Sequence, residues 1–214
     1  MAQRPRHIAV EGPIGAGKSA VAERLAAALG LETVLDNPRD NPFLEAFLGD
    51  KARYAFQAQV FFLLNRHQLL ARLTQGDLFS AGTVTDFLFE RERIFAALHL
   101  SPEELALYDR IHAVVRERVP RPDLVVYLQA PAEVLHQRLR HRGPDPHRPA
   151  LRDLEEMNRV YNDFFFHYAD TPLLVVNTAD VDLSRDDTEL RALATEILKL
   201  RGGTRHYIPR PSAG

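Results

Sequence analysis

The sequence predicts an α/β fold in which helices flank a doubly wound, five-stranded parallel sheet. Three observations lead to this expectation. Short apolar runs alternate with longer segments of helical periodicity along the chain. The apolar runs are mostly continuous, as is typical of strands buried on both faces of a parallel sheet. A glycine-rich loop joins the first apolar run directly to the first helix.

Five runs have the length and composition of strands. Each is short and is either rich in β-branched residues or continuously apolar. The predicted strands are Ile8–Glu11, Glu32–Leu35, Thr83–Asp86, Leu124–Leu128 and Leu173–Val176. Ligands of such sheets bind at the carboxyl ends of the strands, so we expect functional residues directly after these runs.

Segments with helical periodicity fill the intervals between the strands. The first of them ends at Gly30, a residue typical of helix ends. The sequence Ser101-Pro102-Glu103-Glu104 predicts a helix start, because it combines a serine cap, a proline in the first turn and a reciprocal glutamate. The predicted helices are Lys18–Leu29, Pro42–Leu48, Arg53–Leu73, Phe87–Leu98, Pro102–Val119, Pro131–His141, Leu151–Tyr168 and Asp187–Leu200.

The bulk composition fits one globular domain. The chain has 214 residues, of which 45% are hydrophobic and 26% charged, and these are ordinary values for a folded protein. We predict a single domain over residues 1–201 and an irregular tail over residues 202–214. A segment rich in glycine and proline, at about residues 141–150, separates two of the helices.

Charge and cysteine content exclude several function classes. The formal net charge is −2, which argues against general binding to nucleic acids or membrane surfaces. The chain has no cysteine, so disulfides, thiolate zinc sites and cysteine nucleophiles are excluded. Its apolar runs are too short to span a bilayer, and no signal-peptide pattern precedes the first strand. We therefore expect a cytoplasmic enzyme without nucleic-acid or membrane partners.

The loop after the first strand fits the phosphate-binding pattern G-x-x-x-x-G-K-[ST] at every fixed position. In such a loop, backbone N–H groups wrap a polyphosphate at the positive end of a helix. Lys18 would neutralise the β- and γ-phosphates, and the Ser19 hydroxyl would ligate Mg²⁺. The alternative is a turn that only joins strand to helix. The predicted nucleotide-binding residues are Gly12, Pro13, Ile14, Gly15, Ala16, Gly17, Lys18 and Ser19.

Further motifs follow the second and third strands and lie on the long helix between them. They are Asn41-Pro42-Phe43-Leu44, Phe56-Gln57, Thr85-Asp86-Phe87 and, later, Arg142-Gly143. Together they resemble the deoxynucleoside kinase family, and within it the bacterial deoxyguanosine/deoxyadenosine kinase branch. The resemblance extends from the first strand to Thr178 and implies the P-loop kinase fold with an arginine-bearing lid.

The resemblance also implies an activity. The family transfers the γ-phosphate of ATP, or of another nucleoside triphosphate, to the 5′-hydroxyl of a deoxynucleoside. For this branch the expected acceptor is a purine deoxynucleoside, deoxyguanosine or deoxyadenosine, and the expected role is nucleotide salvage. Mg²⁺ is the implied cofactor. Family members are generally dimers, which implies a homodimer.

Phosphoryl transfer needs a group that accepts the proton of the 5′-hydroxyl. In the family this base is a carboxylate at the end of the second strand, generally a glutamate, and here Asp36 occupies the matching position. The alternative is that Asp36 only caps the turn at Asn37-Pro38. Asp40 and Glu11 are further candidates for the base.

A second carboxylate, Asp86, ends the third strand. By resemblance it faces Mg²⁺ and the substrate, and with Ser19 it forms the predicted metal site. A cap on the next helix is the alternative role for Asp86. The family's usual arginine after this carboxylate is replaced by Phe87, and Arg91 is the candidate that restores its charge.

The long helix carries the residues predicted to bind the deoxynucleoside base. Gln59 and Arg66 are seven residues apart, so they lie on one helix face, and both interrupt an apolar run. By resemblance Gln59 pairs with the base, while Arg66 and Glu92 form the polar wall beside it. A polar stripe facing solvent is the alternative. Tyr54 and Phe62 complete this predicted site, although Phe62 also suits the core.

Arginines before and within the breaker-rich segment form the predicted lid. Arg138 and Arg142 are four residues apart and share a helix face, and Arg148 follows. Closing them over the phosphates would stabilise the charge that moves off ATP. An ordinary solvated arginine face, as expected for Arg140, is the alternative. His147 is assigned to substrate binding by its place in the lid.

Three departures from the family pattern leave other functions open. Leu48 stands where a tyrosine often binds the sugar 3′-hydroxyl, Pro144 replaces a second lid arginine, and Pro146 or His147 replaces the lid glutamate. A pyrimidine or broad-specificity deoxynucleoside kinase is therefore the alternative enzyme. A nucleotide-binding subunit without catalysis is the alternative from another class.

Overall fold

The computed structural model describes residues 5–75 and 81–210. These residues form two compact units. The sheet unit lies within Met1–Leu35, Phe79–Phe87 and Arg121–Gly214, and the helical unit lies within Asp36–Leu78 and Leu88–Pro120. The predicted single domain over residues 1–201 thus consists of two such units, and its boundaries stay a prediction.

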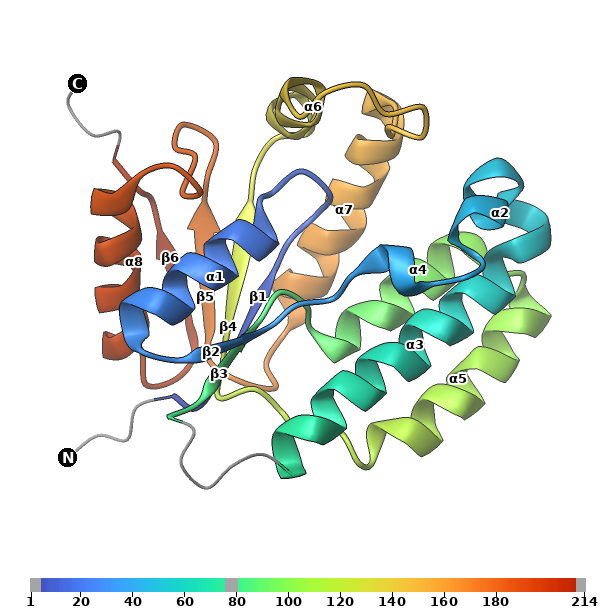
Figure 1. Ribbon diagram of the computed structural model, residues 1–214, viewed down its shortest axis with the longest axis horizontal. Coiled ribbons are helices and arrows are strands. Elements are labelled where there is room, and N and C mark those ends of the chain that lie inside the picture. Colours follow the sequence, from blue (N-terminus) through green and yellow to red (C-terminus); the bar gives the residue numbers. More distant parts are fainter. Residues whose placement is uncertain (1–4, 76–80, 211–214) are drawn as a thin grey trace. The chain divides into compact units, whose positions relative to one another are not determined.

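A parallel sheet of six strands forms the centre of the sheet unit (Figure 1), and its strand order is β2-β3-β1-β4-β5-β6. The α/β class and the parallel sheet are therefore confirmed. The strands are β1 (His7–Glu11), β2 (Glu32–Val34), β3 (Thr83–Thr85), β4 (Leu124–Gln129), β5 (Leu173–Asn177) and β6 (Thr204–Tyr207).

The predicted strand count of five and the predicted irregular tail are both wrong because of β6. This strand pairs in parallel with β5, from Leu173 opposite Thr204 to Val176 opposite Tyr207. Its residues are largely exposed, because an edge strand is held mainly by backbone hydrogen bonds to a single neighbour. The polar sequence Thr-Arg-His-Tyr therefore has no hydrophobic pattern by which it could be recognised. Residues 211–214 of the predicted tail lie outside the described residues.

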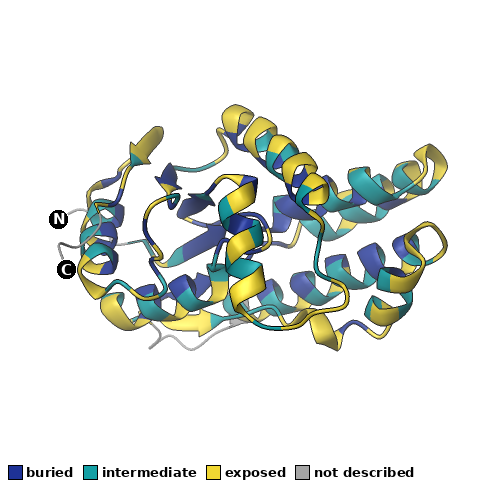
Figure 2. Cartoon of the chain, turned by 90° about the horizontal axis from the view of Figure 1, so that it is seen from above, coloured by how far each residue is buried: buried dark blue, intermediate teal, exposed yellow. Residues whose placement is uncertain are grey.

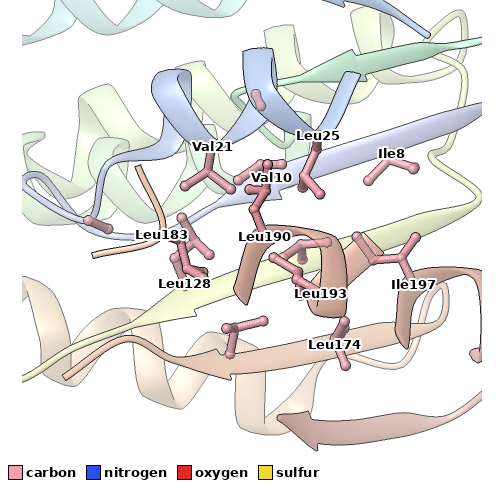
Figure 3. Close-up of a cluster of buried hydrophobic side chains, with 14 of the residues drawn as sticks. Ile8, Val10, Val21, Leu25, Leu128, Leu174, Leu183, Leu190, Leu193 and Ile197 are labelled. Atoms are coloured by element: carbon pink, nitrogen blue, oxygen red, sulfur yellow. The ribbon is translucent and has the colours of Figure 1, made fainter. Parts of the chain in front are cut away.

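Both faces of the sheet are covered, as the side chains of β4 illustrate. Leu124, Val126 and Leu128 belong to the main hydrophobic core together with side chains of α1 (Lys18–Leu29) and α8 (Asp187–Lys199). Figure 3 shows Leu128 of this core beside residues of both helices. Tyr127 alternates to the other face, where its ring stacks on Phe165 of α7 (Leu151–His167) at 4.0 Å between centroids. Figure 2 accordingly shows the central strands as buried.

The helices of the sheet unit begin and end where the sequence predicts, to within one residue. Gly30 ends α1 in the left-handed conformation, with φ 68°. Asp186 caps α8, and its side chain accepts a hydrogen bond from the backbone N–H of Glu189. The remaining helix, α6 (Ala132–His141), packs against α7.

The helical unit is built on a long helix, α3 (Lys51–Gln75). Around it lie a 3₁₀ turn η1 (Pro38–Asp40), α2 (Leu44–Gly49), a second turn η2 (Phe89–Arg91), α4 (Glu92–His99) and α5 (Pro102–Arg116). The predicted helix Phe87–Leu98 begins later than expected, because Leu88 is extended and α4 starts only at Glu92. The capping box predicted at Ser101 and Glu104 is present.

Among the residues that the structure describes, no helix is both long and apolar enough to cross a membrane.

His7 should make the protein less stable in mild acid. Burial lowers its pKa to about 4 from the ordinary value of about 6.5. Between these values the unfolded chain binds more protons than the folded chain, so stability falls as the pH drops from about 6.5 towards 4. His7→Gln should flatten this dependence. Urea unfolding of both proteins at pH 7 and pH 5 tests the expectation. An equal change in the free energy of unfolding between these pH values in wild type and variant would contradict it.

Candidate active site

The phosphate loop connects β1 to α1 and leaves the start of this helix available to an anion. Gly17 precedes the helix in the left-handed conformation, and no side chain caps the helix start. The first-turn N–H groups of α1 can therefore point at a ligand. The loop also needs its other glycines. A Cβ on Gly12 would lie 2.6 Å from the Leu128 carbonyl oxygen, and Gly15 has φ +91°.

Lys18, the first residue of α1, folds back onto the loop. Its Nζ atom donates hydrogen bonds to the carbonyl oxygens of Gly12, at 2.8 Å, and Pro13, at 3.3 Å. This places the ammonium group within the loop that its charge would serve. The strand, loop and helix predicted around Lys18 are thus all present.

Ser19 and Asp86 come together across the sheet unit. The Ser19 hydroxyl donates a hydrogen bond to the Asp86 carboxylate, which is 5% exposed and directly follows β3. Asp86 does not cap a helix, since Leu88 precedes η2. A hydroxyl and a carboxylate are the oxygen ligands that Mg²⁺ takes when substrate phosphates complete its coordination, so these two residues fit the predicted metal. No cluster of three or more ligating side chains occurs among the described residues.

Glu11 is unsuited to the role of catalytic base. The residue is fully buried at the end of β1. Its Oε1 atom accepts hydrogen bonds from the backbone N–H of Gly12 at 2.8 Å and from the Tyr161 hydroxyl at 3.2 Å. The carboxylate is thus engaged inside the sheet unit.

Three charged side chains and one amide gather within the helical unit around the buried Arg66, and we name them the Arg66 cluster: Asp36, Asn65, Arg66 and Glu92. Arg66 on α3 is 4% exposed and pairs with Asp36 at 2.6 Å and with Glu92. The second oxygen of Asp36 accepts a hydrogen bond from the Asn65 amide at 3.3 Å. One arginine therefore holds two carboxylates, and one of these is the predicted base.

Hydrogen bonds around residues 36–40 decide between the roles predicted for Asp36 and Asp40. The turn cap is Asn37, whose side chain accepts a hydrogen bond from the backbone N–H of Arg39. Asp36 is therefore not the cap. Asp40 is exposed and accepts a hydrogen bond from the Asn37 amide at 2.7 Å, so nothing holds it in a buried site.

The predicted base-binding face of α3 is buried. Gln59 is 3% exposed and Arg66 is 4% exposed. The alternative prediction, a polar stripe that faces solvent, is therefore wrong for both residues. Phe62 lies under the Arg66 guanidinium, 5.1 Å from the ring centroid. Tyr54 packs on a smaller cluster around Phe47, away from the contacts of Arg66 that the structure shows.

Arg91 and Tyr108 add to the polar interior of the helical unit. Arg91 is 8% exposed, with its Nε 3.6 Å from Glu92, and its guanidinium lies over the Phe95 ring. Burial, followed by the charge of Glu92, raises the pKa of Tyr108. The Tyr108 hydroxyl is buried and has no hydrogen-bond partner among the described residues. That Arg91 replaces the arginine missing at Phe87 stays a prediction.

The predicted lid arginines have different surroundings. Arg138 donates hydrogen bonds to the carbonyl oxygens of Thr178 and Val181, so it braces the loop after β5, and burial lowers its pKa. Arg142 is exposed at the end of α6. Arg148 donates to the Gly143 carbonyl oxygen within the segment between α6 and α7.

The positions where this chain departs from the family lie mostly at the surface. Pro144, Pro146 and His147 are exposed, and Leu48 is half-buried on α2. No described hydrogen bond shows a side chain replacing the missing tyrosine or the missing lid residues. The roles of His147 and of the lid stay predictions.

Sequence reasoning missed two residues of these sites, Asn65 and Tyr161. Asn65 directly precedes Arg66, and its polarity in an apolar run was the available signal. Tyr161 bonds to a residue 150 positions away, and a contact over that separation leaves no local pattern in the sequence.

Comparisons with known proteins agree with these observations. The sequence model of the deoxynucleoside kinase family matches residues 8–200. The chain is 33% identical to deoxyguanosine kinase of Bacillus subtilis over 138 residues, which are 64% of this chain and 66% of the relative. It is 30% identical to deoxyadenosine/deoxycytidine kinase of the same bacterium over 201 residues, which are 89% of this chain and 90% of the relative.

A solved structure confirms the predicted P-loop kinase fold. Deoxyadenosine kinase from M. mycoides with bound dATP superposes with a TM-score of 0.73 at 22% identity, over 90% of this chain and 99% of that chain. Because the family pattern extends from β1 to the residue after α8 and is not confined to the phosphate loop, the chain belongs to the deoxynucleoside kinase family and is an enzyme of that kind.

Proposed function

We propose that this enzyme transfers the γ-phosphoryl group of ATP to the 5′-hydroxyl of a purine deoxynucleoside, deoxyguanosine or deoxyadenosine, in nucleotide salvage. The observation that carries the proposal is the buried carboxylate of Asp36, which Arg66 and Asn65 orient. The relative named deoxyguanosine kinase supports a purine acceptor.

The donor half of the reaction is assigned to the sheet unit. The N–H groups of the phosphate loop and the start of α1 bind the polyphosphate, and Lys18 exchanges its carbonyl partners for phosphate oxygens. Ser19 and Asp86 would hold Mg²⁺, which would neutralise charge on the phosphates. Arg142 and Arg148 of the lid are assigned to the same donor. Arg138 and Arg142 are assigned the catalytic role of stabilising the charge that moves off ATP, and Arg138 also makes the bracing contacts.

The acceptor half is assigned to the helical unit. Asp36 accepts the proton of the 5′-hydroxyl as the oxygen bonds to the γ-phosphorus and the bond to the ADP leaving group breaks. Arg66 keeps one Asp36 oxygen in place. The longer contact, to Asn65 at 3.3 Å, leaves the other oxygen easier to redirect to the substrate.

Recognition of the base is assigned to α3 and α4. Gln59 offers an amide that can donate to and accept from a base edge. Arg66 and Glu92 form the wall beside it, and Phe62 and Tyr54 supply aromatic surface. We infer that Arg91 supports this wall through Glu92, and that His147 contacts the acceptor from the lid.

We also propose a homodimer. Leu64 on α3 and Leu107 and Val114 on α5 are exposed hydrophobic residues, between 41% and 71% exposed. These two helices pack against each other within the helical unit. Exposed apolar side chains on two packed helices are typical of a protein interface.

The test is turnover of purified protein with Mg²⁺ and ATP against the four common deoxynucleosides. We expect 5′-monophosphate formation with the highest kcat/KM for deoxyguanosine or deoxyadenosine. A higher kcat/KM for deoxycytidine would favour the broad-specificity alternative, to which the relative named deoxyadenosine/deoxycytidine kinase points. ATP binding without product from any acceptor would favour the non-catalytic subunit.

Lys18→Ala should weaken ATP binding about tenfold to a hundredfold, because hydrogen bonds to charged groups contribute roughly 1.5–3 kcal/mol. Titration calorimetry with Mg²⁺ and ATP measures the change. The chain contains only two other lysines, Lys51 and Lys199. Lys199→Ala is the control, because Lys199 pairs with Glu196 at the surface. Equal ATP affinity of the two variants would rule out the proposed role of Lys18.

A further inference from the structure

A buried hydrogen-bonded chain links the entrance of the phosphate loop to α7. The fully buried carboxylate of Glu11 accepts the backbone N–H of Gly12, the first residue of the loop. The same oxygen accepts the hydroxyl of Tyr161, which is also fully buried. A carboxylate removed from water requires such donors. The Tyr161 hydroxyl therefore helps to hold the Glu11 oxygen that orients the Gly12 N–H.

Further polar contacts, made by Asn158 and Asn162, attach the same face of α7 to β4 and the residue after it. Asn158 donates to the Ala130 carbonyl oxygen after β4, at 2.9 Å. Asn162 accepts hydrogen bonds from the Tyr127 hydroxyl at 2.9 Å and from the Gln129 amide at 2.7 Å. Residues 158, 161 and 162 are three and four positions apart, so they share one side of the helix. This side attaches α7 to the carboxyl ends of β1 and β4.

The helix that carries Tyr161 begins directly after the predicted lid. The Asp153 side chain accepts a hydrogen bond from the Ala150 backbone N–H at 3.2 Å, which closes the first turn of α7. Arg148 lies two residues before this turn. The helix α7 therefore follows the segment assigned to the donor phosphates and, through Tyr161 and Glu11, also reaches the first residue of the phosphate loop.

We propose that Tyr161 is a positioning residue of the nucleoside-triphosphate site, acting through Glu11 on the phosphate loop. The inference rests on the proposed binding of ATP by this loop. Removing the Tyr161 hydroxyl takes one hydrogen bond away from the Glu11 oxygen that also accepts the Gly12 N–H, so this acceptor is held less firmly. The loop spends less of its time in the arrangement that fits a polyphosphate, so donor affinity falls. The deoxynucleoside, assigned to the helical unit, is bound as before.

Tyr127 provides a closely matched control. It is buried, with 2% of its surface exposed against 0% for Tyr161, and its ring lies 6.3 Å from the Tyr161 ring. Burial, followed by the charge of Glu11, raises the pKa of Tyr127. Its hydroxyl, however, bonds to Asn162 and not to Glu11. Tyr127→Phe therefore deletes a hydroxyl from the same aromatic stack, while Asn162 keeps its hydrogen bond from Gln129 and Asn158 keeps its bond to the Ala130 carbonyl oxygen, so α7 stays attached.

The experiment compares wild type, Tyr161→Phe and Tyr127→Phe. ATP binding is measured by titration calorimetry, which needs no turnover, and KM is measured for ATP and for the deoxynucleoside. We expect Tyr161→Phe to raise the ATP dissociation constant and the ATP KM about three- to tenfold, the effect of about one hydrogen bond, with the deoxynucleoside KM unchanged. Tyr127→Phe should leave all three constants within about twofold, which is below the contribution of one hydrogen bond.

Two results would overturn the inference. The first is an ATP affinity of Tyr161→Phe that equals that of wild type. The second is an equal loss of ATP affinity in Tyr161→Phe and Tyr127→Phe, which would indicate a structural effect alone. Wild type that binds ATP but forms no product would refute the proposed function and leave this comparison valid. Should Tyr161→Phe fail to fold, Glu11→Gln tests the same contact, because it replaces the charged acceptor with a neutral oxygen. Its ATP affinity should fall in the same direction.

Discussion

Replacing Asp36 with asparagine is expected to lower kcat about a hundredfold to ten-thousandfold, the range by which general bases accelerate proton transfer. The amide has nearly the shape of the carboxylate and can still accept a hydrogen bond from Arg66. It cannot take up the proton of a 5′-hydroxyl. ATP binding should be unchanged, since the phosphate loop belongs to the sheet unit. Steady-state kinetics with the preferred deoxynucleoside measure the effect.

Asp40→Asn is the matched control for this prediction. Asp40 lies four residues further along the chain, is exposed, and bonds only locally to Asn37 among the hydrogen bonds seen for it. Its replacement should leave kcat within about twofold. Asp36→Glu supplies the residue that the family generally has and should keep measurable activity. A loss of less than about tenfold in Asp36→Asn would show that another group accepts the proton.

The parts of the site that could be predicted from the sequence are those fixed by local chemistry. The phosphate loop needs Gly12, Gly15 and Gly17 for backbone reasons, so its pattern is visible without a structure. Strands β1, β4 and β5 are apolar because both sheet faces are covered. The contact between Ser19 and Asp86 could be predicted because the carboxyl ends of parallel strands lie at one edge of the sheet, and Asp86 directly follows such a strand.

The parts that could not be predicted depend on contacts between distant residues or on solvent-exposed backbone. The strand β6 is polar and bonded on one edge, so it lacks a hydrophobic pattern. The Glu11–Tyr161 bond and the bracing of Thr178 by Arg138 join residues that are far apart in the sequence. For Asp36 the sequence allowed a turn cap or a base. Only the packing of α3, which brings Asn65 and Arg66 to the carboxylate, excludes the cap.

Arg66→Ala should destabilise the protein by about 3–5 kcal/mol, the usual cost of removing one partner from a buried ion pair. Arg66 holds Asp36 and Glu92, whose side chains are 6% and 1% exposed. Without the guanidinium, two carboxylates remain in a poorly hydrated interior and repel each other. The contact with the Phe62 ring is lost as well. Urea unfolding at pH 7 measures the free energy.

Two further variants separate this electrostatic cause from a simple loss of packing. Arg93→Ala removes another ion pair of the helical unit, with Asp109, but these side chains are 58% and 38% exposed. Solvent screens such pairs, so the cost should stay below about 1 kcal/mol. Adding Glu92→Gln to Arg66→Ala removes one of the two carboxylate charges that Arg66 held and should recover part of the lost stability. If the double variant is instead as unstable as the sum of the two single changes, repulsion between the two carboxylates is not the cause, and packing of the Arg66 side chain accounts for the loss.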